Sequence, residues 1–70
     1  METEIKEILQ RIVLKTQQLL VEPEKKDEHI IGLKALNSIL QSKISQAKSD
    51  AERKQFNKLL RISLEVISLV

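Results

Sequence analysis

Apolar residues recur at helical spacing along almost the whole chain, and this pattern constrains the fold more than any other feature. A spacing of three and four residues places such side chains on one face of a helix. The chain has one glycine and one proline among 70 residues, too few for the turns of an all-β protein. The pattern predicts helices over about 3–21, 27–47 and 50–69, within a single helical domain covering 1–70.

The first two helices are separated by a polar connector. Pro23 cannot continue a helix and pushes Glu22 out of helical geometry, so the first helix ends there. The connector runs from Glu22 to His29, and its second half is open to a second interpretation as the acidic first turn of the next helix; we expect His29 to be solvated. The first apolar stripe consists of Ile5, Ile8, Leu9, Ile12, Val13, Leu19 and Leu20. The second consists of Ile30, Leu33, Leu36, Leu40, Ile44 and Ala47, and Asn37 lies within it.

The boundary between the second and third helices follows from a change of phase. If the second stripe continued, position 54 or 55 and position 58 would be apolar, but these three positions hold lysine, glutamine and lysine. Ser49 to Glu52 matches a capping box, which starts a helix. These signals predict an all-α, up-down-up three-helix bundle. The alternative is a two-helix hairpin with a long second helix, dimerising into a four-helix bundle.

Surplus apolar residues outside the stripes indicate a binding surface. They include Leu14, Val21, Ile31 and Ile39, and they are most frequent on the third helix. We therefore predict a small helical protein–protein interaction module, such as an adaptor, small chaperone or regulatory subunit. Its partner is another protein or a second copy in a homodimer. The predicted partner-binding residues are Ile62, Leu64 and Leu69 as apolar anchors, with Lys58 and Arg61 at a polar rim.

Nucleic-acid binding is the competing interpretation. The sequence pI is about 9.1, and Lys54, Lys58 and Arg61 share one face of the third helix. The formal net charge is only +2, however, and a single aromatic residue leaves almost no capacity for stacking on bases. The predicted alternative is therefore a small basic nucleic-acid-binding regulator that uses these three cations.

Other functional classes are not expected. Six serines between positions 38 and 68 share one histidine, which does not suffice for nucleophilic catalysis, so we predict that the chain is not an enzyme. With Cys 0 and His 1, we expect neither a metal site nor a cofactor. We also expect no membrane span and no small-molecule substrate. The acidic start, Met1 to Glu4, differs from an export signal and favours a cytoplasmic location.

One stretch of the sequence resembles a known class of small helical proteins. Ala51 to Leu60, followed by an aliphatic helix end, is similar in type to the short helical co-chaperones of secretion-system needle subunits. This resemblance implies a class of small helical binding protein. It shares no diagnostic motif from which residue roles could be carried over.

Overall fold

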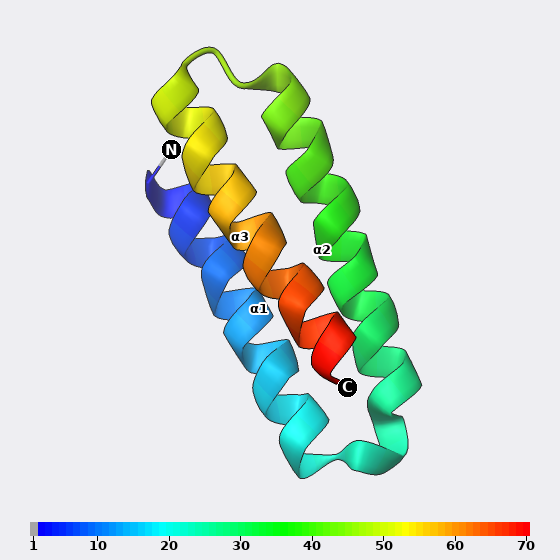
Figure 1. The fold of residues 1–70 in the computed structure, drawn as a ribbon. Coiled ribbons are helices and arrows are strands. Elements are labelled where there is room, and N and C mark those ends of the chain that lie inside the picture. The colour runs from blue at the N-terminus through cyan, green and yellow to red at the C-terminus, as the bar shows by residue number, and fades with distance from the viewer. Residues whose placement is uncertain (1) are drawn as a thin grey trace.

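Three α-helices pack side by side in up-down-up order in the computed structural model, which describes residues 2–70 (Figure 1). The helices are α1 (Glu2–Val21), α2 (Lys26–Gln46) and α3 (Asp50–Leu69), and a short 3₁₀ helix, η1 (Pro23–Lys25), joins the first two. The predicted all-α three-helix bundle is therefore confirmed. The bundle measures 40 × 19 × 15 Å. Within these residues, no helix has a stretch that is long and apolar enough to cross a bilayer.

The turn between α1 and α2 forms where the proline predicts it. Glu22 leaves helical geometry at φ −126° and ψ 63°, and Pro23 begins η1. The prediction of a solvated His29 is wrong, because its side chain belongs to the first turn of α2 and is only 5% exposed. His29 lies four residues before Leu33, on the buried face of α2. Its Nε2 atom lies 3.2 Å from Oε1 of Glu22.

The turn between α2 and α3 occupies residues 47–49. Ala47 and Ser49 both adopt extended backbone geometry, which ends α2 and allows the chain to reverse. The Ser49 hydroxyl accepts a hydrogen bond from the backbone N–H of Glu52 at 3.2 Å, as the serine of a capping box does. Arg53 also contacts the turn, because its guanidinium donates to the backbone carbonyl of Ala47 at 3.5 Å and to Oδ1 of Asp50 at 2.8 Å. A continuous long second helix is thus excluded.

The core lies along the common axis of the three helices. Its buried side chains are Ile8, Ile12, Leu19, Leu33, Leu36, Leu40, Phe56 and Leu59. Asn37, within the α2 stripe, and Ser63 of α3 are also buried, so both polar side chains face the core. The Ser63 hydroxyl and the Asn37 side-chain carbonyl have no hydrogen-bond partner among the described residues.

The apolar stripe of α1 is wider than the core that it meets. Leu9, Val13 and Leu20 were predicted to lie with the buried residues of this helix, but all three are exposed. They lie on one edge of α1, to the side of the line through Ile8, Ile12 and Leu19. Two neighbouring helices cover only part of the circumference of α1, and this edge remains outside.

An ion pair joins the first turn of α1 to the last turn of α2. Lys43 Nζ donates a hydrogen bond to Oε1 of Glu4 at 2.9 Å. This hydrogen bond, together with the lysine charge, lowers the pKa of the Glu4 carboxyl below its ordinary value of 4.5. Because the folded-state pKa is the lower one, the pair stabilises the fold above the unfolded-state pKa. That contribution is lost as the pH falls through the folded-state pKa.

Replacing Lys43 by glutamine is expected to raise the titration midpoint of Glu4. The neutral side chain removes both the charge and the charged hydrogen-bond donor, so the pKa should return toward its ordinary value. A side-chain carboxyl NMR titration measures this shift. The control is Lys34→Gln, which changes an exposed lysine of the same helix and should leave the Glu4 midpoint unchanged. Equal midpoints in the wild type and Lys43→Gln would contradict the assignment.

Candidate protein-binding surface

The three predicted anchors on α3 are all exposed, but the structure divides them between two edges of the helix. Leu69 is 84% exposed, and Ile62 and Leu64 are also accessible. Ile62 and Leu64 are two positions apart, so their side chains point about 160° away from each other. Ile62 and Leu69 share an edge because they are seven residues apart. The predicted set is therefore not one surface.

The edge that carries Leu69 lies beside α1. Leu69 and Val66 of α3, together with Thr16 and Leu20 of α1, line an open groove of about 210 Å³. Leu20 is 79% exposed. The helices α1 and α3 run in the same direction (Figure 1). Residues that come earlier in the two helices, on the edges that contain Leu20 and Leu69, therefore also lie near one another.

Extending both edges by helical periodicity defines a continuous apolar surface. On α1, Leu9 and Val13 precede Thr16 and Leu20 at intervals of three and four residues. On α3, Ile62 precedes Val66 at an interval of four. We name this surface the α1–α3 strip. It consists of Leu9, Val13, Leu20, Ile62, Val66 and Leu69.

The sequence pattern missed the α1 half of the strip. It assigned Leu9, Val13 and Leu20 to the core, since an apolar stripe does not show how much of its width neighbouring helices will cover. No signal in the sequence separates this edge from the buried residues, because both lie within one stripe that spans about 140° of the helix circumference.

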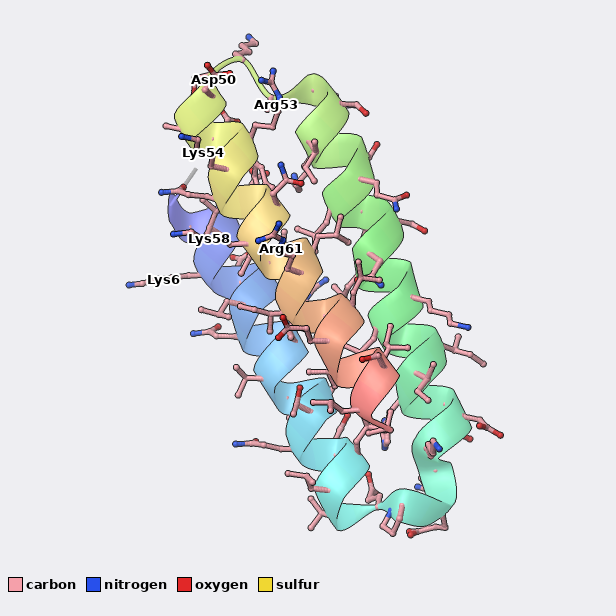
Figure 2. The ribbon with its side chains drawn as sticks, in the orientation of Figure 1. Lys6, Asp50, Arg53, Lys54, Lys58 and Arg61 are labelled. Carbon is pink, nitrogen blue, oxygen red and sulfur yellow. The ribbon has the colours of Figure 1, made fainter. Side chains whose placement is uncertain are left out.

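The predicted cations lie on the outward side of α3. Lys54, Lys58 and Arg61 line an open hollow together with Asn57, Leu60 and Leu64. In Figure 2, Lys54 and Lys58 point to the same side of the bundle as Lys6 of α1. Among the side chains that the structure describes, none of these four cations forms an ion pair. Arg53, by contrast, is paired with Asp50.

A second apolar groove, between α1 and α2, is partly covered by the chain itself. Leu14 and Ile39 border this groove, and Gly32 lies at its floor. The side chain of Lys15 lies over Gly32 so closely that a Cβ there would be 2.9 Å from the lysine Cε. The aliphatic part of Lys15 thus covers Gly32, whereas Leu14 and Ile39 at the border of the groove remain exposed. Ile31 is exposed on the outer side of α2, and Val21 is exposed at the end of α1.

The described residues include no cluster of three or more histidine, aspartate or glutamate side chains that could hold a metal ion. Comparisons with protein-family models, with curated protein sequences and with solved structures found no match.

Proposed function

We propose that the protein is a helical protein–protein interaction module that binds its partner through the α1–α3 strip. One observation carries this proposal: exposed aliphatic side chains from two helices form a single surface, where a self-contained bundle would present polar residues. The groove at the end of the strip, beside Leu20 and Leu69, provides a concave site for a partner side chain. The adaptor, small-chaperone and regulatory-subunit roles all share this binding mode.

Burial of aliphatic surface is the proposed source of affinity. Full burial of a leucine side chain contributes about 1.5 to 3 kcal/mol, and Leu20 and Leu69 have most of that burial still available. The more shielded strip residues, such as Leu9 and Ile62, contribute less. Lys58 lies beside Ile62 at the border of the strip and forms part of its polar rim. Arg61 lies farther round α3 and contributes at most at the periphery.

The nucleic-acid alternative rests on the exposed cations Lys54, Lys58 and Arg61. Their shared face favours it, as does the absence of ion pairs between them and the acidic side chains that the structure describes. Against it stands the position of the only aromatic residue, Phe56, which is buried in the core and cannot stack on a base. We therefore retain nucleic-acid binding as the second candidate function, and an experiment distinguishes it from protein binding.

Two double variants test the proposal. Affinity isolation of the tagged protein from its source cells is expected to recover a specific protein, either another chain or an untagged second copy. Ile62→Ser with Leu69→Ser, on the strip, should remove that protein, whereas Ile31→Ser with Leu64→Ser, outside the strip, should retain it. If the partner protein were recovered equally well with the Ile62→Ser, Leu69→Ser variant, the proposal would be contradicted.

A salt titration distinguishes nucleic-acid binding from protein binding through the strip. Binding that depends on phosphate contacts falls steeply as salt increases, whereas aliphatic contact changes little. Affinity for a labelled RNA or DNA duplex that falls with salt and is abolished by Lys54→Gln, Lys58→Gln and Arg61→Gln together would favour nucleic acid. We expect the duplex to bind weakly in the wild type and no better than a random polyanion.

A further inference from the structure

We infer that the partner of the α1–α3 strip is an amphipathic helix whose apolar face is bordered by acidic residues. This inference rests on the proposed function and adds the chemical class of the partner. Two observations support this partner class: the geometry of the strip and the charges along its two borders.

The strip has the dimensions of a helix-binding surface. From Leu9 to Leu20 it extends over eleven residue intervals of α1, about 16 Å at the rise of an α-helix. Its two rows of side chains come from parallel neighbouring helices, α1 and α3, and α2 lies on the other side of the core (Figure 1). A helix of about three turns laid along the strip would complete a four-helix arrangement.

At the end of the strip near Leu9 and Ile62, the borders are basic on both helices. On α1, Lys6 is one turn before Leu9, and on α3, Lys58 is one turn before Ile62. Figure 2 shows both lysines, with Lys54, directed toward the same side of the bundle. All three are exposed, and none is neutralised by a described acidic side chain. A helix lying between the two rows would therefore meet a lysine on each side.

The same charges disfavour a second copy as the occupant. Among the side chains that the structure describes, the acidic residue that borders the strip is Glu65, one turn before Leu69, against the three lysines at the other end. Two identical strips docked in parallel would bring the lysines together, and docked antiparallel they would offer one glutamate to each set of three lysines. An acidic border on the incoming helix instead pairs with Lys6 and Lys58, and this sets both its orientation and its selectivity.

Two labelled peptides test the inference by fluorescence anisotropy with the full chain. Both have the same leucines on one face of a three-turn helix. One has glutamates and the other has lysines at the positions that border this face. We expect the glutamate peptide to bind about tenfold more tightly at low salt, with a preference that shrinks as salt increases.

Variants test whether Lys6 and Lys58 cause the preference for the glutamate peptide. Lys6→Gln with Lys58→Gln should bring the two peptides close to equal affinity. Lys34→Gln with Lys26→Gln, which changes exposed lysines of α2, should leave the preference intact. Ile62→Ser with Leu69→Ser should weaken the glutamate peptide about tenfold, as expected for lost anchors. All these substitutions are at exposed positions, and circular dichroism checks that each variant keeps its helices.

Several outcomes would overturn the inference. Equal binding of the two peptides, or a preference that survives Lys6→Gln with Lys58→Gln, would reject the acidic partner while leaving a strip-dependent protein module in place. A stable dimer that is disrupted by Leu69→Ser and excludes both peptides would identify a second copy as the occupant. Absence of strip-dependent binding to any protein in the isolation experiment would instead reject the proposed function itself.

Discussion

Replacing Phe56 by alanine is expected to remove most of the stability of the fold. Phe56 is the largest side chain of the core, is almost completely buried, and packs within a cluster drawn from all three helices. Truncation of a buried phenylalanine costs about 3 to 5 kcal/mol through lost burial and the cavity left behind. A chain of this size has a total stability of about 4 to 10 kcal/mol, so one substitution removes a large part of it.

Urea denaturation followed by circular dichroism measures this loss. The control is Ile31→Ala, at a side chain that is 67% exposed, for which we expect a change of about 0.5 kcal/mol or less. If Phe56→Ala unfolded at the same urea concentration as the wild type, Phe56 would not be at the centre of the core.

Replacing Ser63 by alanine is expected to have the opposite sign and to stabilise the protein. The Ser63 side chain is 0% exposed, and its hydroxyl has no hydrogen-bond partner among the described residues. A buried polar group left unsatisfied costs about 1 to 3 kcal/mol, and alanine also has the higher helix propensity. Each kcal/mol corresponds to about 4 to 8 °C in melting temperature for a domain of this size.

The matched control is the same substitution at Ser49. There the hydroxyl accepts the N-cap hydrogen bond of α3, so Ser49→Ala should lower the free energy of unfolding by about 1 kcal/mol. Thermal melts of the two variants should therefore move in opposite directions from the wild type. Destabilisation by Ser63→Ala would show that its hydroxyl has a partner in solution, and that its burial is compensated.

Local signals predicted the turns of the fold well. The turn at residues 47–49 was predicted because the change of apolar phase and the serine cap agree, and both are properties of neighbouring residues. Pro23 marked the other turn for the same reason. His29 was misassigned because its charged neighbours were taken to indicate solvation, although position 29 lies four residues before Leu33 on the buried face of α2.

The binding surface was predicted only in part, because it depends on how the helices are arranged. A helical repeat shows that Ile62 and Leu64 lie outside the main stripe, but it does not show which of them faces α1. That depends on the handedness of the bundle, which the pattern does not encode. For the same reason, Leu9 and Leu20 could not be separated from the core residues of α1 until α3 was placed.

Site-specific photo-crosslinking in the source cells tests the central claim most directly. A photoreactive amino acid at Leu69 or Leu20 lies on the α1–α3 strip, whereas one at Ile31 is equally accessible but lies on the outer side of α2. We predict that the strip positions yield one discrete protein adduct and that position 31 yields none. Adducts that form equally from all three positions, or only with nucleic acid, would contradict the assignment of the strip as a protein-binding surface.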